Sequence, residues 1–233
     1  MLDYLCKWIK YKIKRHELVL EIGSGNNPFI RSNILCDKFP FSSYERAAHS
    51  QIVIDRPFVV ADAVSLPFKD KSIDFVYSAD LAEHLEQPQL FFQECMRVGR
   101  RGVLLLPSML AEQLFGWDFH AVMFSLENDK LIIRPKTNSN RGRFGNLFHE
   151  INARDRHFST FVRKRSNLFR IEYQWQDTIN YDYQSTTTDI NDLWSRQSSA
   201  EHEINAAPSS WQVIKRTIKS LLSLLVRKLF SRY

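Results

Sequence analysis

The sequence predicts an α/β fold: a Rossmann-like, doubly wound, mostly parallel sheet. Three observations carry this prediction. Short apolar runs recur through the first half of the chain and alternate with stretches that favour helices. Residues 102–106 are aliphatic except for the first, as expected for a central parallel strand buried on both faces. Residues 19–22 pass directly into Gly-Ser-Gly, the order of a strand that runs into a ligand-binding loop.

The stretch from Val19 to Pro28 is the central motif of the first half of the chain, and the other predicted binding residues are placed relative to it. Gly23 and Gly25 have no Cβ, so this loop can adopt positive φ and let a ligand approach the main chain. Gly-x-Gly alone occurs at many nucleotide sites, so its meaning depends on the residues at later strand ends. Asn27-Pro28 favours a turn, and we therefore expect only a stunted helix over residues 29–33.

The first half is expected to contain five strands joined by short helices. The expected strands are 18–22, 34–37, 58–62, 73–78 and 102–106, and the expected helices are 3–15, 44–49, 80–86 and 88–98. Strands that alternate with helices in this way indicate a doubly wound sheet.

After Pro107 the pattern changes to a mixed β-hairpin and helical insert. We expect a helix over 109–116, a hairpin of 122–126 with 131–134, a polar loop over 136–146, partly helical structure over 147–168, and a second hairpin of 169–175 with 178–183. Residues 184–210 are rich in Ser, Thr, Asn and Gln, which predicts a polar linker. Apolar residues at steps of three and four predict a basic amphipathic helix over 211–233. We thus expect one domain over 1–183, with a core at 17–107 and a substrate-side part at 108–183.

Charge and cysteine content narrow the function classes. The net charge of +6 resides at the two ends, since residues 1–16 and 211–233 are basic and the part between them is mildly acidic. A nucleic-acid-binding core is therefore not expected. Cys6, Cys36 and Cys95 form no Cys-x-x-Cys pair and are expected to be reduced thiols. With no signal-peptide pattern after the basic N-terminus, we expect a cytoplasmic protein.

Four ordered motifs resemble those of class I S-adenosylmethionine-dependent methyltransferases, and most closely the type 11 group. They are Val-Leu-Glu-Ile-Gly-Ser-Gly at 19–25, Ala-Asp-Ala-Val-Ser-Leu-Pro-Phe at 61–68, Ser-Ile-Asp-Phe-Val-Tyr-Ser at 72–78 and Ala-Glu-His-Leu at 82–85. The resemblance covers roughly residues 17–107 and implies S-adenosyl-L-methionine as cofactor.

The resemblance also implies roles for the glycine loop. Gly23, Ser24 and Gly25 would line the methionine and ribose part of the cofactor. Glu21 would order the loop or bind the amino group of the cofactor. Two departures affect these contacts: Asn26-Asn27-Pro28 replaces the third glycine of the loop, and Asp37 follows Glu21 at a short spacing of sixteen residues.

Four further residues receive cofactor roles from the same resemblance. Asp37 would accept hydrogen bonds from the ribose hydroxyls. Asp62 would accept one from the adenine amine, with the backbone of Ala63 nearby. Ser78 would face the methionine end and the transferred methyl group.

Candidates for acceptor chemistry are less specific. His84 is either a general base beside the acceptor or a packing residue of its helix. His120, His149 and His157, with Glu150 and Asp155, lack the spacing of a zinc motif, so we expect no metal; they line the acceptor pocket or pack. A further group of cations grips an acceptor anion or forms a solvated face: Arg141, Arg143, Arg154, Arg156, Arg163, Lys164 and Arg165.

The expected function is methyl transfer from S-adenosylmethionine to a small-molecule, lipid-linked or glycan-linked acceptor. The alternatives are a non-catalytic binding or scaffold protein with the same fold and an NAD-dependent dehydrogenase, against which the missing third glycine counts. The acceptor, the methylated atom, the general base and the oligomeric state do not follow from the sequence.

The basic helix at 211–233 either lies at an anionic membrane surface, placing the protein peripherally at the inner membrane face, or docks on its own domain or a partner. If it binds membrane, deleting residues 211–233 should abolish co-sedimentation with anionic vesicles. Unchanged sedimentation of the shortened chain would contradict this expectation.

Overall fold

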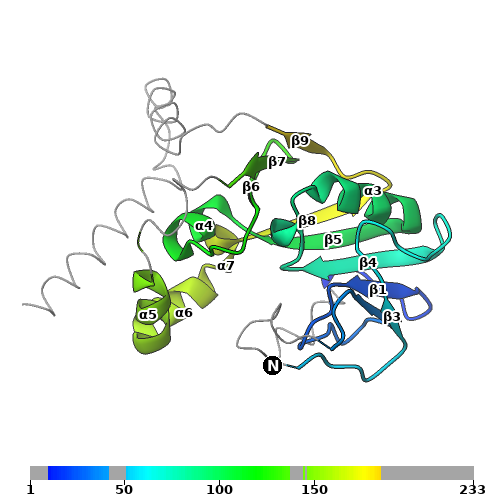
Figure 1. Ribbon diagram of the computed structural model, residues 1–233, viewed down its shortest axis with the longest axis horizontal. Helices are drawn as coiled ribbons and strands as arrows, with labels where there is room; N and C mark the ends of the chain where they lie inside the picture. Colours follow the sequence, from blue (N-terminus) through cyan, green and yellow to red (C-terminus); the bar gives the residue numbers. More distant parts are fainter. Residues whose placement is uncertain (1–9, 42–50, 137–143, 145, 185–233) are drawn as a thin grey trace, which may run out of the picture. The chain divides into compact units, whose positions relative to one another are not determined.

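The protein is built on a six-stranded sheet with the order β3-β2-β1-β4-β5-β8 (Figure 1). The computed structural model describes residues 10–41, 51–136, 144 and 146–184, all within the first of two compact units, residues 1–187. Neighbours from β3 to β5 pair in parallel, and β8 pairs antiparallel with β5. The strands are β1 Val19–Ile22, β2 Ile34–Asp37, β3 Phe58–Val60, β4 Ile73–Ala79, β5 Gly99–Pro107 and β8 Arg170–Gln176. The predicted Rossmann-like, mostly parallel fold is confirmed.

A second, three-stranded sheet has the order β6-β7-β9. Its strands are β6 Val122–Glu127, β7 Lys130–Pro135 and β9 Tyr181–Tyr183. The first predicted hairpin is confirmed: β6 and β7 pair antiparallel around Asn128 and Asp129, both with the positive φ of a tight hairpin turn.

The second predicted hairpin is wrong. β8 joins the central sheet beside β5, whereas β9 pairs in parallel with β7. Burial explains the difference, because Ile171, Tyr173 and Trp175 alternate along β8 and become buried at the β5 edge. Pairing with a three-residue strand would bury far less apolar surface.

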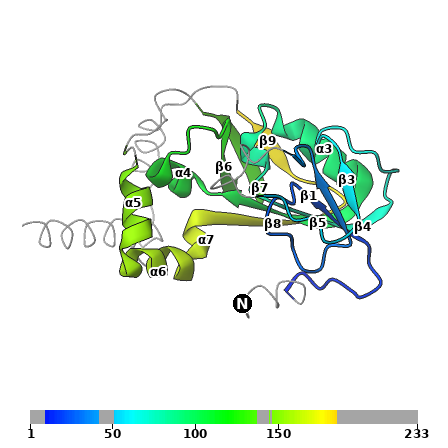
Figure 2. The ribbon, with the colours of Figure 1, turned by 60° about the horizontal axis from the view of Figure 1, so that its bottom comes forward.

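The helices lie on one face of the sheet and beyond one of its ends. α3 Pro88–Val98 packs its buried Phe91, Phe92, Cys95 and Val98 against the sheet. The helices α4 to α7 gather beyond one end of the central sheet (Figure 2). The remaining elements are the 3₁₀ helix η2 Ala82–His84 and the helices α4 Met109–Phe115, α5 Leu147–Arg154, α6 Arg156–Lys164 and α7 Ser166–Phe169.

The opposite face of the sheet carries an aromatic cluster. Tyr11 packs with Phe29, Phe75 and Tyr77, and the rings of Phe29 and Tyr77 stack at 4.4 Å between centroids. All four side chains are buried. Among the described residues, the segment before β1 and the loop after it therefore cover this face where a doubly wound fold usually places helices.

The stunted helix expected over residues 29–33 is not formed; this stretch is a loop with turns. Side chains satisfy its backbone instead. Glu21 Oε2 accepts a hydrogen bond from Phe29 N at 2.8 Å, and Arg56 Nη1 donates to Ser32 O at 2.9 Å. Because these side chains already satisfy backbone groups of the segment, helical hydrogen bonds are not needed to satisfy them.

Several predicted features lie outside the described residues, wholly or in part. They are the helices over 3–15 and 44–49, the loop over 136–146, the linker over 184–210 and the basic helix over 211–233. The domain limits drawn from the sequence stay predictions. In the described part of the chain, no helix has the length and hydropathy needed to cross a bilayer.

Gly102 gives a direct test of the sheet packing. A Cβ at this position would lie 2.3 Å from Val76 O and 2.9 Å from Trp175 Cζ2. Because one of these neighbours is backbone, Gly102→Ala should lower the free energy of unfolding by roughly 2 kcal/mol or more, measured by urea denaturation. Arg100→Ala, an exposed change in the same strand, is the control; equal effects of the two changes would contradict this packing.

Candidate active site

The loop after β1 turns at the carboxyl edge of the sheet. Gly23 and Gly25 have φ of +73° and +53°, which favours glycine at both positions. Gly23 N donates to Cys36 O at 2.8 Å, and Gly25 N donates to Asp37 Oδ2 at 3.2 Å. The loop is thus fastened to the end of β2. A Cβ built on Gly25 would have no atom of the described residues within 4 Å, so these residues leave space open beside the main chain there.

Glu21 fastens the other side of this loop from within the core. Its side chain is buried, and Oε2 accepts hydrogen bonds from Phe29 N and, at 2.7 Å, from Ser32 Oγ. Burial raises the pKa of Glu21 to about 7, against the lowering effect of these two hydrogen bonds. Of the two roles expected for Glu21, these contacts match the ordering of the loop.

Two carboxylates follow the neighbouring strands at the same edge. Asp37 ends β2, and its Oδ1 accepts a hydrogen bond from Phe39 N at 3.0 Å. Asp62 lies two residues beyond β3, close to the buried Ala63. Lys38 Nζ donates to Asp62 Oδ2 at 2.7 Å and is the main cause that lowers the pKa of this carboxyl. The order β3-β2-β1 therefore brings both predicted acids to the edge that holds the glycine loop.

Two buried serines near the loop differ in their hydrogen bonding. Ser78 Oγ donates to Ile22 O at 3.0 Å, so this hydroxyl ties β4 to β1. Ser24 Oγ is buried without a hydrogen-bond partner in the described part of the chain. A buried hydroxyl without a partner is costly unless a bound ligand or water provides one.

His84 lies in η2, a few residues after β4. Its ring stacks on Phe119 at 5.5 Å between centroids and meets His120 edge-on at 4.8 Å. The residue keeps contact with solvent. Desolvation by the surrounding protein, followed by the neighbouring His120, lowers the pKa of His84 to about 4. The imidazole is therefore neutral at pH 7.

A buried group of ionisable side chains lies next to His84. His120 Nδ1 contacts Glu112 Oε1, and Lys136 Nζ donates to Glu112 Oε2 at 2.9 Å and to Trp117 O. Glu83 is 1% exposed, and its Oε2 has no hydrogen-bond partner among the described residues. Burial raises the pKa of Glu83 well above its usual range. Glu112 and Lys136 were not predicted as site residues, since no local spacing in the sequence links them to His120.

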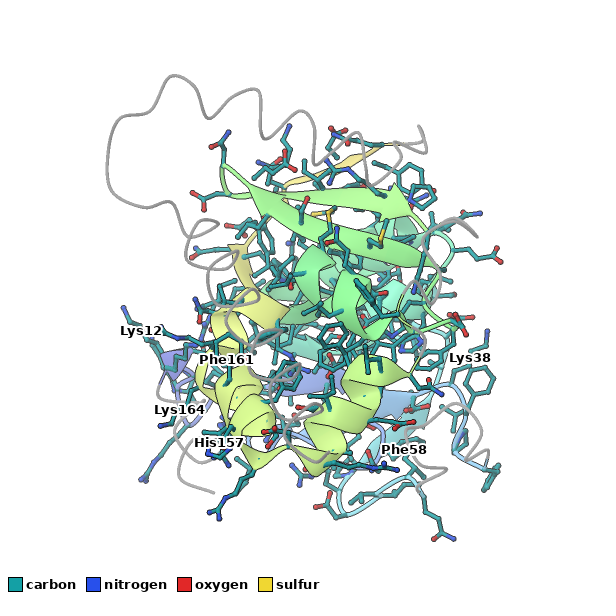
Figure 3. The ribbon with its side chains drawn as sticks, turned by 90° about the vertical axis from the view of Figure 1, so that its left-hand side faces the viewer. Lys12, Lys38, Phe58, His157, Phe161 and Lys164 are labelled. Atoms are coloured by element: carbon teal, nitrogen blue, oxygen red, sulfur yellow. The ribbon has the colours of Figure 1, made fainter. Side chains whose placement is uncertain are left out.

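The other predicted acceptor-side residues are not brought together. His149 Nε2 lies 2.9 Å from Phe115 O, in contact with a packed aromatic group. His157 is 95% exposed in its side chain and lies on α6 at the surface with Lys164 (Figure 3). Arg154, Arg156, Arg163 and Arg165 are exposed as well, and Arg154 pairs with Glu150. The described cations of this group are thus exposed to solvent, and Arg141 and Arg143 lie outside the described residues.

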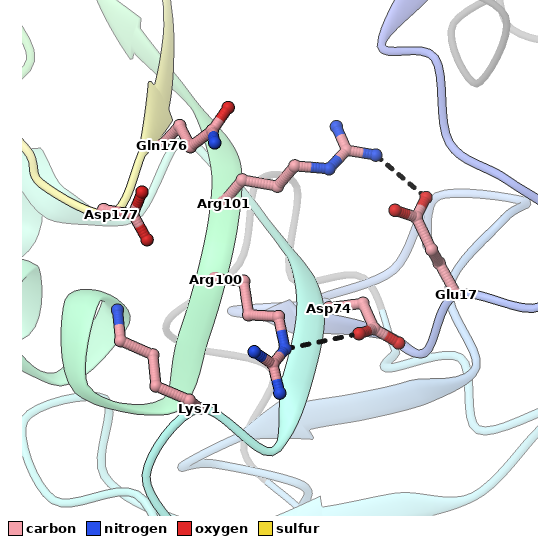
Figure 4. A pocket seen from close by; sticks show the side chains of 7 residues that line it. All are labelled: Glu17, Lys71, Asp74, Arg100, Arg101, Gln176 and Asp177. Carbon is pink, nitrogen blue, oxygen red and sulfur yellow. Dashed lines mark hydrogen bonds and ion pairs between the residues drawn. The ribbon is translucent and has the colours of Figure 1, made fainter.

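A cavity of about 420 Å³ lies at the amino-terminal edge of the parallel strands, away from the glycine loop (Figure 4). Its charged lining is largely paired: Arg101 with Glu17 at 2.8 Å and Arg100 with Asp74 at 3.6 Å. Ligands of open α/β sheets bind at the carboxyl ends of the strands. This cavity is therefore not the candidate active site.

Comparison with known proteins supports one class. Residues 40–106 match the family model described as a methyltransferase domain. This confirms the resemblance that the motifs indicated, although the match begins after the glycine loop. No curated protein matches the chain.

Solved structures were also compared. YcgJ from Bacillus subtilis is 21% identical, over 46% of this chain and 52% of that protein, with a TM-score of 0.35. Methyltransferases that use S-adenosylmethionine from Thermotoga maritima and Aquifex aeolicus are 23% and 16% identical over 46% of this chain, with TM-scores of 0.32 and 0.34. The alignments cover 54% and 64% of those two proteins, so this chain matches little more than half of their length. Likenesses this weak carry no argument about function.

The fold is Rossmann-like, and the methyltransferase family whose model matches residues 40–106 implies S-adenosylmethionine as cofactor. The residues fit such a group. Among the described residues, space lies open beside Gly25 and the buried hydroxyl of Ser24 has no hydrogen-bond partner, while Asp37 and Asp62 offer acceptor oxygens.

The raised pKa of Glu21 predicts a measurable pH dependence. Because the folded state holds this proton up to about pH 7, Glu21 stabilises the fold below about pH 4.5, and this contribution is lost as the pH rises through 7. Glu21→Gln keeps an acceptor for Phe29 N and Ser32 Oγ but cannot titrate. Relative to wild type, the variant should therefore gain up to ~3 kcal/mol in free energy of unfolding between pH 5 and pH 8.

Urea denaturation at both pH values measures this difference. Glu86→Gln, at an exposed position, serves as control and should follow the wild type. A Glu21→Gln variant with the pH dependence of the wild type would show that the buried carboxyl does not titrate in this range.

Proposed function

We propose that the protein transfers a methyl group from S-adenosylmethionine to an oxygen, nitrogen or carbon of a small-molecule, lipid-linked or glycan-linked acceptor. The observation that carries this proposal is the glycine loop at the end of β1, with the carboxylates of Asp37 and Asp62 beyond the two neighbouring strands. The family match over residues 40–106 supports the same reaction class.

When bound, S-adenosylmethionine supplies a methyl group already activated by a sulfonium sulfur. The side chains of this chain would bind and orient. Asp37 would accept hydrogen bonds from ribose hydroxyls, Asp62 would accept one from the adenine amine, and Ser24 Oγ, which has no hydrogen-bond partner among the described residues, would gain one. Orientation of two reactants can supply ~7–11 kcal/mol of a barrier, so few catalytic groups are required.

His84 is our candidate for proton transfer. Its imidazole is neutral above about pH 4, so it can accept a proton from an acceptor hydroxyl or amine as the methyl group is transferred, but the lowered pKa makes it a weaker base than a free imidazole. Its place in η2 supports this role, since Leu81 just before η2 packs against Gly23: a Cβ on Gly23 would lie 3.1 Å from Leu81 Cδ2. The acceptor would then enter on the His84 side of the glycine loop.

The rival functions are a non-catalytic protein that kept the fold and a dehydrogenase that uses NAD. No observation favours either one. In both cases S-adenosylhomocysteine should fail to stabilise the protein against heat, and in the second case NAD should stabilise it instead.

The binding test compares two glycine-to-alanine variants that should lose similar stability through backbone strain. Gly25 and Gly116 have φ of +53° and +58°, so alanine should strain both turns similarly. Gly25→Ala places a methyl group in the space left for the cofactor and should weaken S-adenosylhomocysteine binding about 10-fold or more by calorimetry. Gly116→Ala, at the end of α4, should leave the affinity unchanged. Equal affinities of the two variants, or no binding by the wild type, would overturn the proposed cofactor site.

A further inference from the structure

Three potential metal ligands meet beside the end of β4. Glu83 and His84 are adjacent in η2, and His120 comes from the loop between α4 and β6. One ligand atom from each lies within 4.8 Å of the other two. Among the described residues, no other group of three or more potential ligands lies this close together. The backbone holds the two segments together, because Ala121 N donates to Glu83 O at 2.7 Å.

Glu83 is the unusual member of this group. Its side chain is buried, and its Oε2 has no hydrogen-bond partner in the described part of the chain. The nearby acid Asp80 is held by Arg170 at 2.6 Å, so that arginine is already engaged. Lys136, the buried cation of the region, is engaged by Glu112. A buried carboxyl oxygen without a hydrogen-bond partner costs free energy in either protonation state, and a bound cation would remove this cost by coordinating the ionised form.

His120 is oriented as a ligand. Its Nδ1 is taken by Glu112, which is itself fixed by Lys136 Nζ at 2.9 Å, and this leaves Nε2 for another partner. A histidine that binds a metal almost always hydrogen-bonds through its other ring nitrogen to a carboxylate or carbonyl. Glu112, with a side chain that is fully buried, meets this description.

His84 lies on the open side of the group. It is exposed to solvent and stacks on Phe119, whose side chain is also exposed. A histidine ring nitrogen is the commonest metal ligand in proteins. Two buried ligands and one exposed ligand would leave a coordination position facing solvent, as in metal sites that bind a substrate.

We propose that Glu83, His84 and His120 bind one divalent transition-metal ion. Two imidazoles and a carboxylate suit zinc, and they also suit non-haem iron. Ligand atoms on one zinc ion lie roughly 3.3 Å apart, so the group, whose ligand atoms lie within 4.8 Å of one another, must contract by up to about 1.5 Å. The exposed side chain of His84 can make this movement. Glu112 acts as a positioning residue for His120.

If the proposed function holds, the metal would also act on the acceptor. Leu81, which precedes η2, packs against Gly23 of the loop assigned to the cofactor. An oxygen of the acceptor bound at the open metal position would then lie on the side from which the methyl group is delivered. The metal would lower the pKa of that oxygen and so help to form the nucleophile, and His84 would then serve as a metal ligand instead of the proton acceptor proposed above.

Calorimetry with Zn²⁺ alone tests the site on the full chain without an affinity tag. The wild type should bind one ion per chain with a Kd of about 10 µM or lower. His84→Ala changes an exposed side chain, so the fold should survive, yet zinc affinity should fall at least about 100-fold. Glu112→Gln should weaken binding about 10- to 100-fold through His120. His157→Ala, at the surface of α6, is the control and should bind zinc as the wild type does.

Two results would overturn the proposal: no stoichiometric binding by the wild type, or binding that His84→Ala leaves unchanged. Circular dichroism of each variant separates loss of a ligand from loss of the fold. Calorimetry with S-adenosylhomocysteine separates this proposal from the proposed function. Zinc binding without S-adenosylhomocysteine binding would remove the methyltransferase and keep the metal site, and the reverse result would remove only the metal site.

Discussion

The buried carboxyl group of Glu21 is the constraint on which the site depends. It lies inside the sheet, in β1, and holds the loop after this strand by accepting hydrogen bonds from Phe29 N and Ser32 Oγ. A carboxyl at such a position costs free energy unless it is protonated or well hydrogen-bonded, and here burial moves its pKa to about 7. Glu21, whose burial costs free energy, thus shapes a loop at a position where related folds have a helix.

The loop in turn determines how the neighbouring residues are arranged at the carboxyl edge of the sheet. Because residues 29–33 do not form a helix, Phe29 turns inward and stacks on Tyr77 over one face of the sheet. Gly23 and Gly25 then lie above the ends of β1 and β2, with Gly25 N bonded to Asp37. The same carboxylate that the family resemblance assigns to the ribose also fixes the loop. Changes at Asp37 would therefore affect loop structure and ligand binding together.

A second group of buried ionisable side chains fixes the surroundings of His84. Glu112 and Lys136 pair with both side chains fully buried, and the pair holds His120 edge-on to His84. An isolated buried ion pair contributes little net stability, since desolvation of both charges offsets their attraction. The ion pair instead positions His120, because Glu112 occupies one ring nitrogen of this histidine and the other ring nitrogen faces Glu83 and His84. This arrangement joins α4, η2 and the second sheet around one point.

Local pattern was enough for most of the strands and for the class of fold. The run 34–37 and the aliphatic stretch 102–106 predicted β2 and the centre of β5, because burial on both faces leaves an unmistakable apolar run. Asp37 and Asp62 were predicted as the acids that end the second and third expected strands, and the strand order β3-β2-β1 of the structure brings them to one edge. The sequence could not show where β8 pairs, since Ile171, Tyr173 and Trp175 alternate in the same way whether they face β5 or a hairpin partner.

What only the tertiary structure decided is which distant side chains share a buried environment. Glu83 and His84 come from η2, Glu112 from α4, His120 from a loop and Lys136 from the end of a strand, and no periodicity relates them. The sequence by itself determined a sheet, a glycine loop and two acids, because these depend on residues close together in the chain. The group around His120 depends on contacts such as that of Lys136 with Glu112, 24 positions apart, and only the packed fold selects those.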